Sequence, residues 1–397
     1  MKEFFMLRKG VLLKLVFGAL LVLSGCIEPF EPEVEVSKAG FLVVDGSLNG
    51  AGRSTIRLSR TTALRSSAKA QVESKARVYM EEEGGQQYLL PETVAGTYVS
   101  AAVALPPGTR VRLHFTTAGQ REYVSDYTEL KATPPIDSVT WKAGSRGVQI
   151  AVNAHDDTQQ SRFYRWDYTE TWEFTSAYKS VVEYRNRAFY PRAENIYNCW
   201  GTEEATAIKL GTTSKLGQDV VSEQPLTLLP PTSVKLRYRY SILVRQYALS
   251  SSEYSYWEAL RKNTETQGNL FDPLPTQLTG NVHAVVDAGE QVIGFIGAQS
   301  VTEKRIFIGT RQLPQTWVFD TGYETCMTDT IPRPNPPLPP PPPPPTEAQA
   351  LDYFDSGLPF PIDVLHFATS PRNFYLYSTA DCVDCRRRGT NVKPSFW

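Results

Sequence analysis

The most regular stretch of the chain is residues 109–116, which read Thr109-Arg110-Val111-Arg112-Leu113-His114-Phe115-Thr116. Its apolar side chains recur at every second position, which is the pattern of a strand with one buried face. Similar short runs follow one another from Phe41 to Leu130, separated by turns such as Asn49-Gly50 and Pro106-Pro107-Gly108. The strands expected here are 41–47, 54–60, 76–82, 86–90, 96–101, 109–116 and 121–130.

This strand count and spacing are typical of an immunoglobulin-like sandwich, and the Gly96-Thr97-Tyr98 step before a Pro-Gly turn also resembles transthyretin-like sandwiches. Thr133-Pro134-Pro135 marks a boundary, after which the chain is still β-rich but less regular. We therefore expect a mainly β protein, with a sandwich at residues 40–132 and a larger β-rich domain at 133–397. The second domain contains one clear helix, predicted to start at Ser250 with Glu253 in a capping box and to end at Gly268.

Two strands of the second domain contain candidate binding residues. In the first, aromatic side chains from Tyr164 to Phe174 share one parity and polar side chains such as Arg165 and Asp167 share the other. Core packing is the favoured interpretation of the aromatic face, and a platform for a sugar or peptide is the alternative. The second strand spans 236–249, and its arginines form either a solvated face or a site for an anionic ligand. The candidate surface comprises Trp166, Tyr168, Trp172, Arg237, Arg239 and Arg245.

The N-terminus has the three parts of a secretory signal at residues 1–25: a basic start, an apolar run from Leu15 to Leu23, and small residues before a cleavage site. The apolar run is too short to span a bilayer, which needs about 20 residues. Its end, Leu23-Ser24-Gly25-Cys26, resembles the bacterial lipobox, which implies cleavage before Cys26 and acylation of its thiol and amino group. The alternative is an ordinary secreted protein in which Cys26 is incidental. We expect attachment to a lipid membrane through acylated Cys26.

Residues 26–39 are acidic and contain proline, with Glu and Pro alternating between Glu28 and Glu35, and they predict an extended, solvated tether. The full chain has 397 residues. Without the signal peptide at residues 1–25, it retains 37 basic and 41 acidic side chains. A net charge of this sign does not favour a nucleic-acid binder. In Bacteroidota, acidic residues directly after the lipidated Cys resemble a signal for the outer face of the outer membrane.

Residues 332–345 are dominated by proline, with an unbroken run at 339–345. Such a run forms a polyproline II rod. Only about 50 residues follow it, which is too few for a stable separate domain unless covalent cross-links hold them together. We expect a surface excursion of the second domain, and the alternatives are an interdomain linker or a motif for a proline-binding partner.

Four cysteines remain after Cys26: Cys199, Cys326, Cys382 and Cys385. An even number in an exported chain indicates disulfides, and four cysteines allow three pairings. The Cys382-Val383-Asp384-Cys385 motif also fits a redox or zinc site, but it lies near the end of a β protein and lacks other ligands at metal-binding spacing. Structural disulfides are the favoured interpretation.

No catalytic motif is recognisable, and we expect neither an enzyme nor a cofactor. The polar run around Asn153, His155, Asp156 and Asp157 offers calcium ligands, but a polar turn is favoured. A glycosidase site consists of two carboxylates at a set distance in space, and a single sequence does not reveal which acidic residues lie that close together.

Several segments together resemble one family, the uncharacterised Bacteroidota lipoproteins grouped as domain of unknown function 4249. They are Cys26 to Phe30, Phe41 to Gly46, Pro135 to Val139, Tyr240 to Tyr247, Gly294 to Ile308, Cys382 to Arg386 and Pro394 to Trp397. The proline tract departs from the usual pattern of the family. The resemblance implies an outer-membrane lipoprotein commonly encoded beside a TonB-dependent receptor, and it supplies no catalytic or ligand residue.

These observations lead to a ranked set of roles. The first is a non-catalytic outer-membrane lipoprotein, facing the cell exterior, that is an accessory or ligand-binding partner of a TonB-dependent receptor. The second is an adhesion or envelope-assembly lipoprotein with no soluble ligand. A thiol oxidoreductase at Cys382 and Cys385, or a hydrolase on the aromatic strand, comes third.

Overall fold

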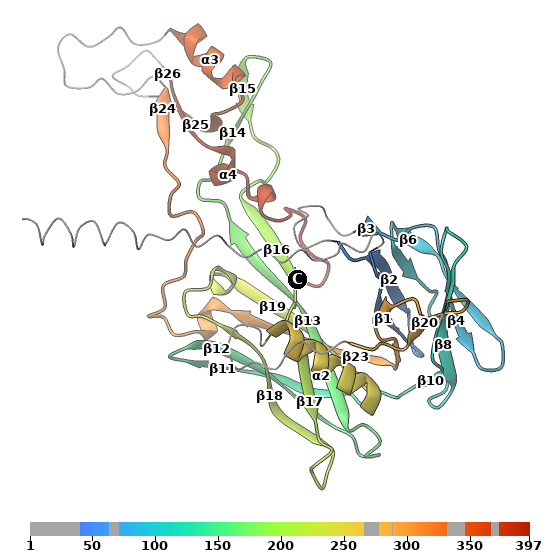
Figure 1. The fold of residues 1–397 in the computed structure, drawn as a ribbon. Coiled ribbons are helices and arrows are strands. Elements are labelled where there is room, and N and C mark those ends of the chain that lie inside the picture. Colours follow the sequence, from blue (N-terminus) through green and yellow to red (C-terminus); the bar gives the residue numbers. More distant parts are fainter. Residues whose placement is uncertain (1–39, 63–70, 266–277, 288, 332–345, 367–372) are drawn as a thin grey trace, which may run out of the picture. The chain divides into compact units, whose positions relative to one another are not determined.

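The computed structural model describes residues 40–62, 71–265, 278–287, 289–331, 346–366 and 373–397. The predicted signal peptide, the lipidation site at Cys26, the tether and the proline-rich segment lie outside the described residues. Within the described residues the chain is mainly β, which confirms the predicted fold class (Figure 1).

The N-terminal region consists of two β-sheets that share one core, defined here as the N-terminal sandwich. The first sheet has the order β21-β1-β2-β7-β6, with β22 beside β1 and β3 beside β2, and the second has the order β20-β9-β8-β4-β5, with β10 beside β8. The first-sheet strands are β1 Leu42–Leu48, β2 Thr55–Arg60, β3 Gln71–Val72, β6 Glu92–Val94, β7 Thr97–Val99, β21 Val292–Ile293 and β22 Gly297–Ala298. The second-sheet strands are β4 Arg77–Glu82, β5 Gln87–Leu90, β8 Arg110–Thr116, β9 Glu122–Ser125, β10 Thr128–Glu129 and β20 Val282–Ala284.

Strand β8 shows why these residues form a sandwich. Val111, Leu113 and Phe115 are buried, while Arg112 and His114 occupy the opposite, partly exposed face. The buried set packs against Val44, Ile56 and Leu58 of the first sheet. Alternation along the strand therefore places one face of each sheet in the shared core.

Three strands of the N-terminal sandwich come from far along the sequence. β21 and β22 pair in parallel with β1, and β20 pairs with β9. Figure 1 shows these orange segments beside blue and cyan strands. The sequence analysis assigned all of residues 133–397 to the second domain, and the structure corrects this for β20–β22, because Val282, Val292 and Ile296 are buried in the N-terminal core.

The second region is built on two sheets around one core. A three-stranded sheet has the order β11-β12-β18, and a five-stranded sheet has the order β16-β13-β19-β23, with β17 beside β13. The strands are β11 Ile136–Gly144, β12 Gly147–His155, β13 Phe163–Thr175, β16 Asn198–Glu204, β17 Lys209–Thr212, β18 Val220–Leu229, β19 Arg239–Ala248 and β23 Val301–Gly309. Their inner faces supply Ile150, Val152, Tyr164, Ile242 and Val244 to the core.

The predicted helix is present as α2, Ser251–Glu265. Ser250 caps it, because the Ser250 hydroxyl accepts a 3.1 Å hydrogen bond from the Glu253 amide. The predicted end at Gly268 lies outside the described residues. Short helical turns occur at η1 Val234–Leu236, η2 Thr310–Gln312, α4 Ala380–Val383 and η3 Cys385–Arg387.

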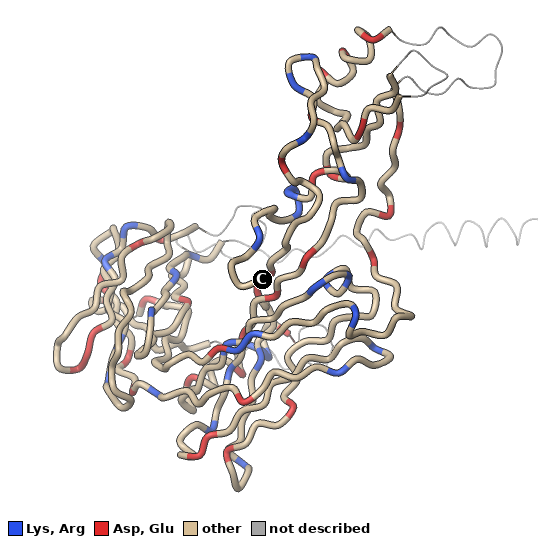
Figure 2. The backbone as a smooth tube through the Cα atoms, turned by 180° about the vertical axis from the view of Figure 1, so that it is seen from behind, with Lys and Arg blue, Asp and Glu red and all other residues tan. Residues whose placement is uncertain are grey.

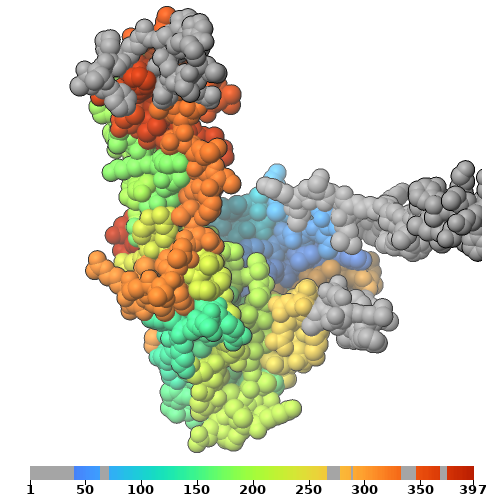
Figure 3. Space-filling view, turned by 90° about the vertical axis from the view of Figure 1, so that its left-hand side faces the viewer, coloured from blue at the N-terminus to red at the C-terminus, as the bar shows by residue number. Residues whose placement is uncertain are grey.

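A smaller group of elements, the C-terminal cluster, joins two distant parts of the chain. It contains β14 Val182–Arg185, β15 Ala188–Pro191, β24 Asp329–Ile331, α3 Glu347–Asp355, β25 Phe360–His366 and β26 Asn373–Ser378. Phe189, Phe354 and Tyr375 pack together in its core. The strands β14 and β15 pair as an antiparallel hairpin. Figure 3 shows this green part of the chain against the orange and red segments that follow much later in the sequence.

Two disulfides join segments that flank the C-terminal cluster in the sequence. Cys199 of β16 bonds to Cys385, and Cys326 bonds to Cys382. The predicted disulfides are therefore present, and the Cys-x-x-C motif does not close on itself: each of its cysteines bonds to a distant partner.

Candidate functional site

The structure separates the predicted surface residues into several environments. Trp166 and Tyr168 are 1% and 6% exposed and belong to the core, so the candidate surface does not include them. Trp166 Nε1 donates a 2.8 Å hydrogen bond to the buried Gln246 side chain. Strand parity explains this, since even-numbered positions of this part of β13 face inward.

Trp172 lies beside a partly buried ionic cluster. Lys235 Nζ is 4.9 Å from the Trp172 ring centroid and donates hydrogen bonds to Glu170 and Glu203, at 2.6 and 2.5 Å. Tyr240 also donates to Glu170, at 2.7 Å. Burial lowers the pKa of Lys235, but its bonds to Glu170 and Glu203 outweigh that effect and raise the pKa. These partners satisfy one another, which is the pattern of a structural cluster.

Arg239, one of the predicted anion-binding arginines, is exposed and lies beside two aromatic rings. Its guanidinium lies 4.3 Å from the Phe307 centroid and 5.3 Å from that of Trp397. Arg305 lies 3.5 Å from the Phe396 centroid, and Arg237 lies 5.0 Å from that of Tyr238. The C-terminal residues thus interleave with arginines of β19 and β23 on the sheet face that the sequence assigned to solvent.

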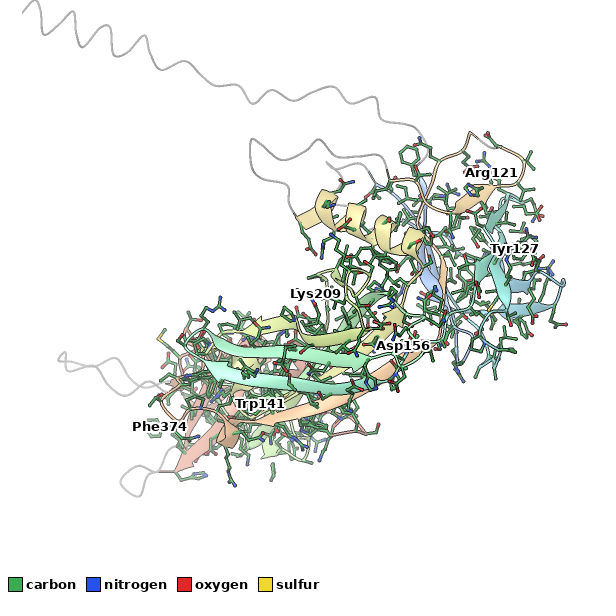
Figure 4. The ribbon with its side chains drawn as sticks, turned by 90° about the horizontal axis from the view of Figure 1, so that it is seen from below. Arg121, Tyr127, Trp141, Asp156, Lys209 and Phe374 are labelled. Atoms are coloured by element: carbon green, nitrogen blue, oxygen red, sulfur yellow. A yellow bond between two sulfur atoms is a disulfide. The ribbon has the colours of Figure 1, made fainter. Side chains whose placement is uncertain are left out.

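The polar turn around Asp156 binds its own backbone. Asp156, labelled in Figure 4 just after β12, accepts hydrogen bonds from Thr158, Gln160 and Ser161. Burial raises its pKa, but these bonds prevail and hold the pKa below its usual range. A nearby cavity of about 650 Å³ includes this turn. Since the buried acid is fully engaged, we interpret the turn as structural, and no group of metal-ligating side chains occurs among the described residues.

A second polar cluster lies on the outer face of β8. The Glu81 carboxylate lies 2.6 Å from His114 Nδ1 and accepts a 2.9 Å hydrogen bond from Arg112, while His114 Nε2 lies 2.7 Å from Glu122. Burial raises the pKa of Glu81, but the bonds from His114 and Arg112 prevail and lower it. Arg112 also stacks over Tyr127, labelled in Figure 4, at 4.6 Å. These groups pair with one another, although Arg112 Nε is buried without a hydrogen-bond partner among the described residues.

A different arrangement occurs in a cavity of about 610 Å³ that we call the arginine cleft. Its walls come from β1 and β2 of the N-terminal sandwich and from β13, β16, β19, β23 and α2. The charged and aromatic lining residues are Asp45, Arg53, Arg57, Arg165, Asp167, Glu204, Arg245, Tyr247, Trp257 and Glu303.

Strand register builds one wall of the arginine cleft. Asp167 pairs with Arg245, and Arg245 pairs with Glu303, so one row of side chains crosses β13, β19 and β23. The next row contains Arg165 and Tyr247, which are also register partners. Because the side chains of a strand alternate, these rows lie on the face opposite Trp166 and Tyr168.

Arg165 is held in place by two aromatic rings. Its guanidinium lies 4.3 Å from the Tyr247 centroid and 4.6 Å from that of Trp257, which α2 contributes. The nearest carboxylate, Asp167, is 3.8 Å away, and Arg165 Nε is buried without a hydrogen-bond partner among the described residues. A stacked guanidinium keeps its donor edge available to a ligand.

Of the predicted surface, Arg245 alone lines the arginine cleft. The polar parity of β13 indicated where Arg165 and Asp167 face, but the sequence analysis did not select them. It also missed Arg53, Arg57, Trp257 and Glu303, for which no sequence signal exists, because their proximity depends on how distant elements pack. Figure 2 shows acidic and basic positions interspersed along the described chain, so charge runs do not reveal the cleft either.

Within the described residues, no helix is both long and apolar enough to cross a membrane.

Comparison with known proteins assigns the chain to one family. No curated protein matches the chain. The family described as Domain of unknown function (DUF4249) matches residues 27–305, which is most of the 397 residues. The chain therefore belongs to the DUF4249 family.

Proposed function

We propose that the protein is a non-catalytic, lipid-anchored protein of the outer membrane that captures a ligand for a TonB-dependent receptor. The lipobox ending at Cys26 supports the anchor, and the acidic tether after it supports exposure at the cell exterior. The arginine cleft is the observation that carries ligand capture.

Two features of the cleft favour binding. Its volume of about 610 Å³ lies within the range of small-molecule sites, about 300–1,000 Å³. Stacking on Tyr247 and Trp257 also removes rotamer freedom from Arg165 before a ligand arrives. A preorganised side chain loses less entropy on binding, so more of its interaction energy contributes to affinity.

Co-purification from native membranes in mild detergent tests the receptor partnership. Tagged wild-type protein should recover a TonB-dependent receptor, identified by mass spectrometry, and Cys26→Ala should recover much less because it lacks the anchor. Recovery of no receptor would contradict the partnership and favour an adhesion or envelope-assembly role.

Metabolic labelling with a fatty acid tests the anchor separately. The wild-type protein should incorporate labelled palmitate and Cys26→Ala should not, because acylation requires the Cys26 thiol. Equal labelling of both proteins would show that Cys26 is not the attachment site.

A further inference from the structure

One side of the arginine cleft has an excess of negative charge. Arg245 contacts three carboxylates: Asp167 at 3.2 Å, Glu303 at 3.1 Å and Glu204 at 3.6 Å. A single guanidinium neutralises one of these charges, so this row favours a cationic group on a ligand.

Other lining residues carry an excess of positive charge. Arg53 forms no hydrogen bond or ion pair with any described residue, and Arg57 reaches Asp45 only at 3.5 Å. Arg165 is the third guanidinium, and its nearest carboxylate lies at 3.8 Å. Asp167 already pairs more closely with Arg245, which leaves Asp45 as the closest remaining carboxylate partner of these three cations, so their charge is not balanced by the lining residues on this side.

The spacing of the two charged groups sets the size of the ligand. Arg165 and Asp167 are two residues apart on β13, so the backbone positions of their rows are separated by about 7 Å along the strand, although the charged atoms of these two side chains approach to 3.8 Å. An extended peptide also advances about 3.3–3.6 Å per residue. A ligand whose opposite charges are two or three residues apart fits both rows.

Other ligand classes match the lining less well. A phosphate or sulfate ion would use the three cations but would be repelled by the acidic row around Arg245. A neutral sugar would need an aromatic face, and Arg165 already occupies one face of Tyr247 and of Trp257.

We propose that the arginine cleft binds the two charged ends of a short peptide, the carboxylate at Arg165 and Arg53 and the ammonium group at Glu303, Glu204 and Asp167. This inference rests on the ligand-capture part of the proposed function and adds the class of ligand. It does not depend on which receptor, if any, receives the peptide.

Calorimetric titration of the full chain, purified from membranes in mild detergent, tests the inference with four tripeptides. They are trialanine, its N-acetyl derivative, its C-terminal amide, and the peptide blocked at both ends. Trialanine should bind most tightly, each single block should weaken binding about tenfold, and the doubly blocked peptide should bind weakest, because each block removes one charge-assisted contact.

Two variants assign the ends of the peptide. Arg53→Ala should weaken peptides with a free carboxylate about tenfold and leave the C-terminal amide unaffected. Glu303→Gln should weaken peptides with a free amino group and leave the N-acetyl peptide unaffected. Arg146→Ala is the matched control: Arg146 is an exposed arginine of the β11–β12 turn without a partner among the described residues, and its removal should not change binding.

Equal affinity for trialanine and the doubly blocked peptide, or no binding of any peptide, would overturn the inference. So would tighter binding of inorganic phosphate or maltotriose. These outcomes are separate from receptor recovery: peptide binding without a co-purified receptor sustains the cleft assignment alone, and a recovered receptor without peptide binding sustains the partnership alone.

Discussion

Glu253, on the first turn of α2, is 3% exposed and accepts a 3.4 Å hydrogen bond from Trp257 Nε1. Its carboxylate lies against Gly297, where an added Cβ would be 2.2 Å from Glu253 Oε2. Burial raises the pKa of Glu253 to about 7, against the opposing effects of Arg165 and Lys131. This acid therefore keeps its proton in the folded protein at pH values where it ionises in the unfolded chain.

Glu253→Gln should reduce the pH dependence of stability. Between the ordinary pKa of 4.5 and about 7, the folded state binds more protons at this site than the unfolded state, so stability is lost as pH rises through that window. The variant cannot ionise, and relative to wild type it should gain about 3 kcal/mol in unfolding free energy between pH 5 and pH 8. Urea unfolding at both pH values measures this, and parallel losses in the two proteins would contradict it.

Gly46 of β1 is a second position at which one residue determines local structure. Its φ is 134°, and an added Cβ would be 2.2 Å from the Thr55 carbonyl oxygen of the paired strand β2. Both the backbone conformation and the close approach require a residue without a side chain.

Gly46→Ala should lower the unfolding free energy by about 2–4 kcal/mol, because the strand must shift or adopt a strained φ. Gly84→Ala is the control, since no atom lies within 4 Å of a Cβ at that position. Thermal unfolding of the two variants should differ clearly, and equal melting temperatures would refute this role of Gly46.

At the scale of elements, the Cys326–Cys382 disulfide ties the segment before β24 to α4, across 56 residues of sequence. Near this disulfide, Ile362 of β25 and Leu376 of β26 belong to a small core that also contains Cys326 and Cys382. A cross-link stabilises such a cluster because it restricts the unfolded chain.

Replacing both cysteines, Cys326→Ser with Cys382→Ser, should destabilise the C-terminal cluster by about 2–5 kcal/mol. Hydrogen exchange should accelerate at the amides of β24 and β26 and stay unchanged in β4 and β8, which serve as an internal control. Uniform acceleration across both regions would show that the disulfide stabilises the whole chain rather than this cluster.

At the scale of the whole molecule, the N-terminal sandwich depends on residues 282–298. Val292 and Ile293 extend the first sheet beside β1, and Val282 to Ala284 extend the second beside β9. Ile296 and Ala298 are 1% and 2% exposed in the same core.

A fragment of residues 40–132 should therefore lack cooperative thermal unfolding, because its core misses these buried side chains and two sheet edges are left unpaired. A version that carries residues 278–300 after a flexible linker should recover a cooperative transition. Cooperative unfolding of the shorter fragment would show that the predicted domain at 40–132 is autonomous.

The strands of the N-terminal sandwich were largely predictable from sequence because alternation is a local property. The expected runs at 109–116 and 54–60 correspond to β8 and β2 within one residue at each end. The opposite faces of β13 were equally legible, and core packing was the correct interpretation for Trp166 and Tyr168. The same alternation along the strand led the sequence analysis to select Arg245. It could not identify the other residues that line the arginine cleft with Arg245.

The sequence alone determined that the chain is mainly β, where most N-terminal strands run, and that four cysteines form disulfides, because these depend on two-residue periodicity, turn residues and an even cysteine count. Tertiary structure alone decided the disulfide pairing, the transfer of β20–β22 to the N-terminal sheets, and the meeting of Arg53, Arg165, Trp257 and Glu303 in one cleft. Each of these joins residues far apart in the chain, and their proximity follows from the packing of whole sheets rather than from any local pattern.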